Sequence, residues 1–142
     1  MRTEYVAGEP ICPGGFVLGT ACVIAFVPSL DLTRSAAFYA DVLGLSLEDV
    51  TPYACVLRGG LVMVRVTKVG SLQPQPFTVL GWQVDDIHAV ADQLAAAGVD
   101  LVRYESLDQD SAGVWTTPGG DRVAWFNDPD GNILSLTQFA PR

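Results

Sequence analysis

The sequence contains one histidine, and its surroundings argue against imidazole chemistry. His88 falls between Ile87 and Ala89 in a segment with helical periodicity, where a side chain on the helix flank is normally solvated. One imidazole per chain excludes any metal site within a protomer that uses two. The Gly-x-Ser-x-Gly, Walker and His-Glu-x-x-His motifs do not occur in the chain. No residue pattern typical of a nucleophile, a phosphate cradle or a zinc protease is therefore present.

Two arginines lie in apolar segments, where a cation needs a partner. Arg65 and Arg122 fall inside segments of apolar residues that favour strands. A guanidinium in such a setting requires an anionic or carbonyl group opposite it, so both residues are candidates for contacting a ligand. The alternative is that each lies on an exposed strand face and pairs with one of the chain's many carboxylates.

Composition limits the class of protein and its partners. With 142 residues, of which 49% are apolar, the chain suits one globular domain. Its net charge of −8 repels phosphate backbones, so nucleic acids and anionic membranes are poor partners. No apolar run approaches the roughly 18 residues needed to cross a bilayer, and no basic segment leads into an apolar one at the N-terminus. We expect a soluble cytoplasmic protein.

The three cysteines do not form a recognisable framework. Cys12, Cys22 and Cys55 are odd in number and lack Cys-x-x-Cys spacing. A disulfide scaffold is therefore not expected, and Cys22 and Cys55 are predicted to be small buried hydrophobic residues.

The first half of the chain predicts a strand, a helix and three more strands after an irregular arm at residues 1–16. Asp31 or Ser29 can cap the helix, and Gly44 can end it. The helix buries a stripe made of Phe38, Val42 and Leu45, with Tyr39 and Leu43 beside them. The expected strands are residues 21–27, 45–51, 53–58 and 61–69.

The second half repeats this order after a proline-containing linker at residues 70–76. Asp86 follows Asp31 by 55 positions, and it or Asp85 can cap a second helix that closes at Gly98. The expected strands are residues 77–84, 100–107, 114–117, 122–126 and 133–138. The second half thus contains one strand candidate more than the first, and the repeated order predicts two β-α-β-β-β modules, about 17–69 and 77–138, within a single domain spanning 17–142.

Two stretches carry a family resemblance. Val123 to Gln138 reads VAWFNDPDGNILSLTQ, an aromatic strand, a tight turn and an alternating strand. Ser29 to Leu45 reads SLDLTRSAAFYADVLGL and matches a first-helix pattern. Together they resemble the vicinal oxygen chelate superfamily, which includes glyoxalase I, extradiol dioxygenases and bleomycin-resistance proteins. The resemblance implies an α+β fold in which the modules' curved mixed sheets form a cup with the helices outside.

The resemblance also places a metal site, and this sequence lacks its ligands. Matched by position, the ligands from the first strand of each module and from the strand after the DPDGN turn are Ile24, Val79 and Ser135. Isoleucine and valine have no lone pair, and a neutral serine hydroxyl is a weak ligand. We therefore expect no metal and no other cofactor, with these three residues lining the cup.

Other cup-lining residues follow from strand alternation. Phe26, Gly81, Gln83, Ile133 and Thr137 share the parity of the three former ligand positions, whereas Leu80, Trp82 and Val84 face the helix. Parity is open for the strands within 45–69 and 100–126, where the large or polar candidates are Tyr53, Met63, Arg65, Trp115, Arg122 and Trp125. Aromatic walls with a few polar groups are typical of a small-molecule site, although each aromatic residue alone could be ordinary core.

Four functions fit these features, and the sequence favours the first. The first is a non-enzymatic binder similar to the bleomycin-resistance branch, which sequesters an antibiotic or another aromatic compound without metal. The second is a metal-independent isomerase or lyase using Arg122 or Tyr53, the third a glyoxalase- or dioxygenase-type metal enzyme, and the fourth a purely structural or partner-binding domain. The resemblance further implies a homodimer, either side by side or with modules exchanged across the 70–76 linker.

Overall fold

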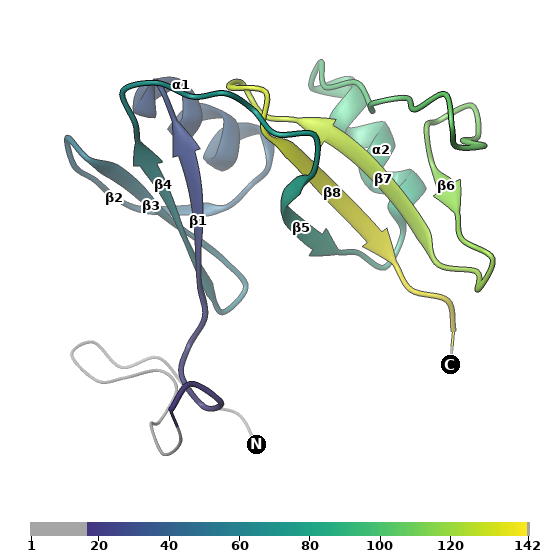
Figure 1. The fold of residues 1–142 in the computed structure, drawn as a ribbon, viewed down its shortest axis with the longest axis horizontal. Coiled ribbons are helices and arrows are strands. Elements are labelled where there is room, and N and C mark those ends of the chain that lie inside the picture. Colours follow the sequence, from purple (N-terminus) through teal and green to yellow (C-terminus); the bar gives the residue numbers. More distant parts are fainter. Residues whose placement is uncertain (1–16, 142) are drawn as a thin grey trace.

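The computed structural model describes residues 17–141, and the arm predicted at 1–16 lies outside that range. Figure 1 shows two similar halves joined by an extended linker. The first half contains β1 (Ile24–Ser29), α1 (Leu32–Ala36), the π-helix η1 (Ala37–Val42), β2 (Ser46–Val50), β3 (Ala54–Gly59) and β4 (Val62–Lys68). The second contains β5 (Thr78–Gln83), α2 (Ile87–Ala96), β6 (Trp115–Thr116), β7 (Arg122–Asn127) and β8 (Ile133–Gln138).

The two halves have the same topology. Their sheets run in the orders β1-β4-β3-β2 and β5-β8-β7-β6. In each sheet the strand before the helix pairs in parallel with the last strand, and the remaining pairs are antiparallel. The predicted α+β fold of two βαβββ modules is confirmed, with open mixed sheets that do not close into a barrel.

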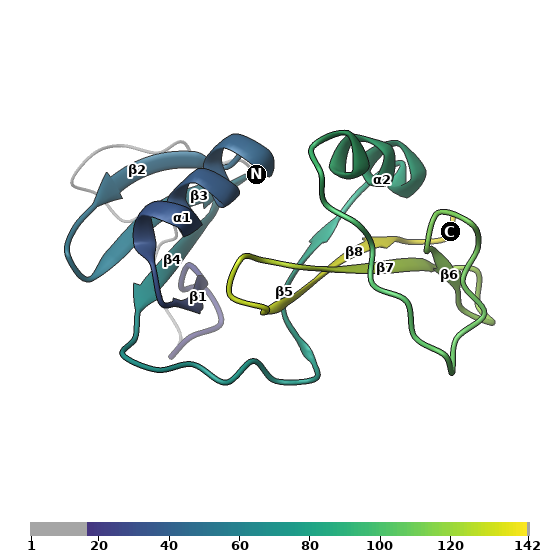
Figure 2. The same cartoon turned by 90° about the horizontal axis from the view of Figure 1, so that it is seen from above.

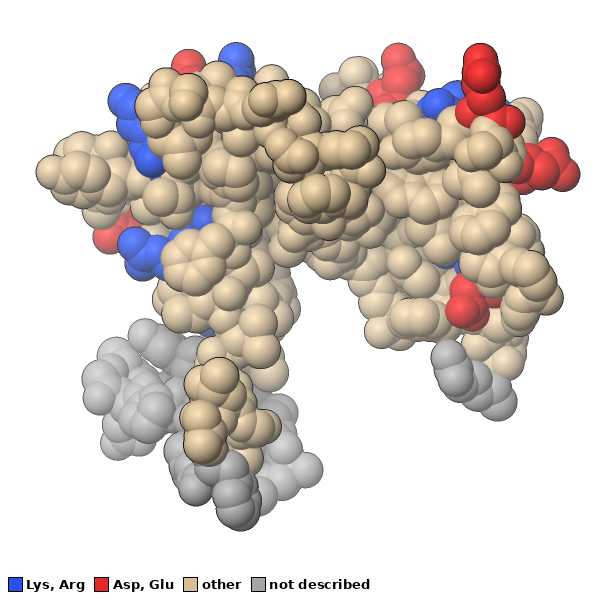
Figure 3. All heavy atoms as spheres, in the orientation of Figure 1, with Lys and Arg blue, Asp and Glu red and all other residues tan. Residues whose placement is uncertain are grey.

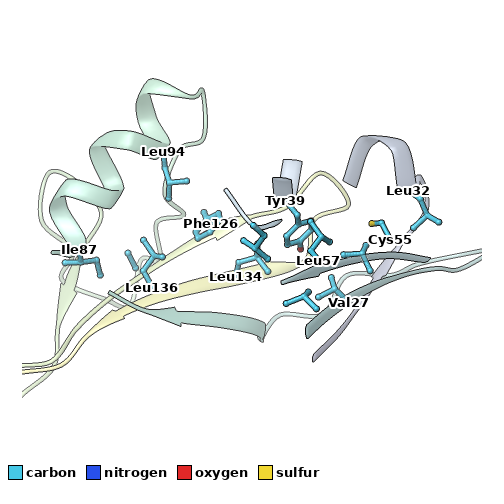
Figure 4. Packing of buried hydrophobic residues seen from close by; sticks show 14 of the residues in the cluster. Val27, Leu32, Tyr39, Cys55, Leu57, Ile87, Leu94, Phe126, Leu134 and Leu136 are labelled. Atoms are coloured by element: carbon cyan, nitrogen blue, oxygen red, sulfur yellow. The ribbon is translucent and has the colours of Figure 1, made fainter. Parts of the chain in front are cut away.

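The helices cover one side of both sheets, and no helix lies on the other side. Figure 2 shows α1 and α2 on the same side of the molecule. The buried side chains lie between helices and sheets, as Figure 4 shows for Tyr39, Leu57 and Leu134. This core is continuous across the two modules and includes residues of both. The sheets and helices therefore form an open cup, with the helices outside and a face free of helices inside.

Both predicted helix caps are confirmed. The Asp31 carboxylate accepts a hydrogen bond from the Arg34 N–H at 3.1 Å, and the Asp86 carboxylate accepts one from the Ala89 N–H at 3.1 Å. Each satisfies a backbone donor that the first helical turn leaves without a partner.

The first helix widens into a π-helix after five residues. The Leu43 N–H donates to the Phe38 carbonyl at 3.0 Å, five residues back, and Gly44 ends the segment at φ +82°. The wider turn changes which side chains face the sheet. Tyr39 is fully buried and Leu45 nearly so, but Val42 is 36% exposed, so its predicted place in the buried stripe is wrong.

Two other predictions also fail. Residues 100–107 form no strand; the segment is irregular and contacts β7 through the Val102 N–H, which donates to the Trp125 carbonyl at 2.7 Å. Cys22 is exposed and disulfide-bonded, not a buried thiol, whereas Cys55 is buried and free as expected.

The DPDGN turn between β7 and β8 locks the two modules together. The buried Asp128 carboxylate accepts hydrogen bonds from the Tyr39 hydroxyl and the Asn132 side chain, both at 2.8 Å. Asn132 also donates to the Pro28 carbonyl at 3.0 Å. These contacts connect positions about 90 to 100 residues apart in the chain, which makes the turn a docking element for module one.

Asp130 adds an ion pair to this junction. Its carboxylate accepts from the Arg34 guanidinium at 2.7 Å and from the Leu30 N–H at 3.1 Å. The Asp130 side chain is fully buried, while that of Arg34 is 47% exposed. Because the pair is satisfied on both sides, the junction holds the two sheets in a fixed relation.

Candidate functional site

The candidate site is the side of the two sheets that carries no helix, which we call the open face. Figure 3 is drawn in the orientation of Figure 1, where the strands lie in front of the helices, and the middle of this view is uncharged. Strand alternation decides which side chains lie on it. In module one Val27, Val64 and Val66 are buried on the helix side, so their neighbours along the strands point to the open face.

Module one contributes an apolar patch that contains one cation. Phe26 pairs with Arg65 across β1 and β4, and Arg65 pairs with Val56 across β4 and β3. Ile24 and Met63 form the neighbouring pair. Phe26 is 61% exposed although it is a large aromatic residue. The structure thus brings together four of the residues predicted to line the cup.

The Arg65 guanidinium has no partner within the described residues. It takes part in no ion pair and no side-chain hydrogen bond there, although the residue is half-buried. The other arginine of this sheet, Arg58, pairs with Glu48 at 3.1 Å. Arg65 is therefore a cation with free donors beside an aromatic ring.

Module two contributes small residues beside aromatic ones. Gly81, Ser135 and Trp125 form one row across β5, β8 and β7. Thr137 lies in the next row between Gln83 and Val123, and Val123 pairs with Trp115. A Cβ added at Gly81 would lie 2.6 Å from the Ser135 Oγ, so a larger residue here would have to displace that hydroxyl. Because Gly81 and Ser135 are small, this row forms a low floor, that is, a part of the sheet surface with little side-chain bulk beside the indole rings.

Three aromatic rings cluster at the edge of that floor. The Trp115 and Trp125 rings stack with centroids 6.2 Å apart, and Tyr104 meets Trp125 edge to face at 5.3 Å. Tyr104 was missed by sequence reasoning because it lies in the segment mistaken for a regular strand. Gln109 fixes that segment by accepting from the Tyr104 N–H at 2.7 Å and donating to the Val102 carbonyl at 2.9 Å.

Two predicted ligand-binding residues do not join the open face. Arg122 pairs with Gln138 and shares the parity of the buried Ala124 and Phe126, which places it on the helix side. Tyr53 precedes β3 in a bend and is 78% exposed. The isomerase or lyase interpretation relied on these two residues.

The former metal positions lack the groups to hold a metal. Ile24 lies on the open face of β1 and Ser135 on that of β8, while Val79 sits at a register shift in β5 and packs against the core. Across residues 17–141, no three His, Cys, Asp or Glu side chains gather where they could bind an ion. One hydroxyl between two aliphatic side chains is not a donor set for a divalent cation, so the residues present do not fit the superfamily's metal.

The single histidine belongs to a structural contact. His88 on α2 meets the Asp110 carboxylate at 2.8 Å, and both side chains are more than 40% exposed. Burial alone would raise the pKa of Asp110, but hydrogen bonds from His88 and from the Val114 and Ala112 N–H groups outweigh it and lower that pKa. The pair connects the irregular segment that contains Asp110 to α2, on the helix side of the sheet. It does not reach the open face.

One cavity lies on the helix side. It measures about 270 Å³ and sits between η1, α2 and the strands beneath them. Its lining is mostly apolar: Val42, Leu43, Trp82, Gln83, Val84, Val90, Gln93, Leu94, Phe126 and Leu136. On the open face, in contrast, Phe26 is exposed, while Arg65 and Trp125 are half-buried.

Two βαβββ modules with a shared helix-free cup define a paired-module α+β protein. The model of the Glyoxalase/Bleomycin resistance protein/Dioxygenase superfamily matches residues 23–136, and the chain belongs to this superfamily. The resemblance read from the sequence is thereby confirmed. No helix within residues 17–141 is both long and apolar enough to cross a membrane.

Solved structures with the same fold include binders and enzymes. The chain is similar to TnmS3, an antibiotic binding protein from Streptomyces sp. CB03234, with 23% identity, a TM-score of 0.69 and coverage of 88% of this chain and 100% of that one. It is also similar to lactoylglutathione lyase from Agrobacterium tumefaciens, with 18% identity, a TM-score of 0.67 and coverage of 84% and 93%. No curated protein matches the chain. At such identities the likeness shows the fold alone.

Proposed function

We propose that the protein binds an aromatic small molecule, such as an antibiotic, on its open face and sequesters it without metal. The observation that carries this proposal is the half-buried cluster of Tyr104, Trp115 and Trp125 beside the small residues Gly81 and Ser135. Aromatic rings next to small residues offer a flat ligand a surface on which to stack. The antibiotic-binding activity named for TnmS3 agrees with this choice.

The same face gives little support to catalysis. Among the residues placed there, none is a histidine, a carboxylate pair or an activated nucleophile, and the former metal positions hold Ile24 and Ser135. General acid–base chemistry needs a titratable group within hydrogen-bond reach of the substrate. Binding without turnover requires only the stacking surface and the polar groups that this face carries.

We further propose that two chains pair and close the cup. Ile24 is 44% and Phe26 61% exposed on adjacent positions of this face, so a second copy could cover apolar side chains here. A second copy over this face would enclose the ligand that one chain leaves open. Sedimentation equilibrium at micromolar concentration should give twice the mass of one chain, and a monomer at every concentration would contradict the pairing.

Fluorescence titration tests the binding proposal. N-phenyl-1-naphthylamine, an uncharged aromatic probe that brightens in apolar sites, should bind saturably. Phe26→Ala and Trp125→Ala each remove an aromatic surface of the open face and should weaken binding about tenfold or more, since such rings contribute on the order of 1–3 kcal/mol.

The matched control changes an aromatic residue on the opposite side. Trp82 lines the helix-side cavity, so Trp82→Phe should leave the affinity unchanged. No saturable binding would contradict the proposal. Loss of affinity only in the Trp82 variant would move the ligand to the helix side, and that result would also refute it.

A further inference from the structure

Arg65 is the one feature of the open face that simple aromatic binding leaves unexplained. Its guanidinium offers five N–H donors and no acceptor, and no protein group within residues 17–141 takes up a side-chain bond from it. The flanking residues of its row are Phe26 and Val56, neither of which can accept. The donors of this half-buried cation are therefore available to an acceptor from outside the fold, and an anionic acceptor gives the stronger bond.

The acidic residues of β2 do not pair with Arg65. In the row formed by Asp49, Val56, Arg65 and Phe26, Asp49 lies two strands away from Arg65, about 10 Å at ordinary strand spacing. Glu48 is engaged by Arg58 at 3.1 Å. In a chain with 16 acidic and 8 basic residues, a carboxylate partner would have been easy to provide, and this position does without one.

Arg65 has a counterpart at the equivalent position of module two. The offset of 55 that relates the caps Asp31 and Asp86 also maps Phe26 onto Gly81. Across the parallel pair, Phe26 faces Arg65 and Gly81 faces Ser135. Arg65 is therefore the module-one counterpart of Ser135, the position matched to a metal-binding carboxylate. A guanidinium there repels cations and attracts anions.

We propose that Arg65 recognises an anionic group of the ligand, so that the compound bound on the open face carries a carboxylate, sulfonate or phenolate next to an aromatic body. This inference rests on the proposed binding function and names its ligand class. Phe26 contacts the aromatic body while the Arg65 fork donates to the anion. The overall charge of −8 makes such a ligand unexpected, because the surface as a whole disfavours anions.

Two probes that differ by one sulfonate test the inference. 8-Anilinonaphthalene-1-sulfonate is N-phenyl-1-naphthylamine with an added anionic group. The wild-type protein should bind the sulfonate more tightly than the neutral probe, and the preference should shrink with added salt. Arg65→Met should weaken sulfonate binding by about tenfold or more and leave the neutral probe unaffected. Arg65→Lys should fall between the two, because it keeps the charge but loses the fork.

Arg122→Met is the matched control, since it removes the same charge from the helix side. It should leave the affinity for both probes unchanged. Equal affinity of the wild-type protein for both probes, or equal losses in the Arg65 and Arg122 variants, would overturn the inference. A changed oligomeric state of Arg65→Met with unchanged probe affinities would also overturn it, by assigning Arg65 to a contact with a second copy.

The two proposals fail in different ways. If the neutral probe binds and depends on Phe26 and Trp125, while the sulfonate is not preferred, only the anion inference fails. If neither probe depends on those aromatic residues, the proposed function fails first.

Discussion

At the scale of single residues, the most consequential side chain outside the open face is Tyr39. It is fully buried, and its hydroxyl donates to Asp128 at 2.8 Å. Burial, followed by the nearby Asp128 charge and the hydrogen bond to it, raises the pKa of Tyr39 far above its usual range. The hydroxyl therefore stays protonated and serves as a permanent donor between the modules.

Tyr39→Phe should destabilise the protein by about 1–3 kcal/mol, because it removes one donor from a buried carboxylate. Urea denaturation followed by fluorescence measures this as a lower midpoint at unchanged slope. Tyr53→Phe is the control, since Tyr53 is 78% exposed, and it should have no effect. Equal stability of the two variants would show that the Tyr39–Asp128 bond contributes nothing.

The raised pKa of Tyr39 also predicts a dependence on pH. The folded pKa lies above the unfolded value of about 10, so the contribution of this group is complete below pH 10 and decreases as the pH rises above it. Wild-type stability should thus fall above pH 10 relative to Tyr39→Phe, and the gap between them should narrow. Denaturation curves at pH 8 and pH 10.5 test this, and a constant gap would refute it.

At the scale of elements, the features that depend on neighbouring residues in the sequence were predicted correctly. The caps Asp31 and Asp86 were predictable because a short acceptor before an apolar helix satisfies the first-turn N–H groups wherever the helix packs. The parity of β1 and β8 followed from alternation for the same reason. The parity of Arg122 stayed open because nothing local sets the parity of β7; its antiparallel register with β8 does.

Elements that depend on distant contacts escaped sequence reasoning. Residues 100–107 have an apolar pattern but no strand to pair with along their length, so they remain irregular and are held by Gln109. The π-helix η1 also has no local signature. It places Tyr39 against Asp128, which lies 89 positions further on. No residue near Tyr39 in the sequence predicts this contact.

The DPDGN turn allows a direct test at this scale. Gly131 has φ +88°, and an added Cβ would lie 3.1 Å from the Pro74 Cγ of the linker. Gly131→Ala should therefore destabilise by about 1–3 kcal/mol. Gly70 has open space around its Cα, so Gly70→Ala should be neutral or slightly stabilising, by up to about 1 kcal/mol. Thermal unfolding of both variants checks the contrast, and matching midpoints would contradict it.

At the scale of the whole molecule, the DPDGN turn of the superfamily signature joins the two modules. Asp128 and Asn132, within the recognisable turn, hold module two to module one through Tyr39 and Pro28. That structural task persists whether or not a metal is bound. The signature could therefore predict the fold from sequence while saying little about function, which depends on the residues of the open face.

The central claim is that the protein works as a binder and does not carry the superfamily's metal. Elemental analysis of protein purified without chelator, with calorimetric titration of divalent metals, tests this most directly. We predict no stoichiometric metal and no binding heat, because Ile24, Val79 and Ser135 cannot supply a ligand set. One tightly bound metal per chain would contradict this claim and would favour a metal-dependent enzyme instead.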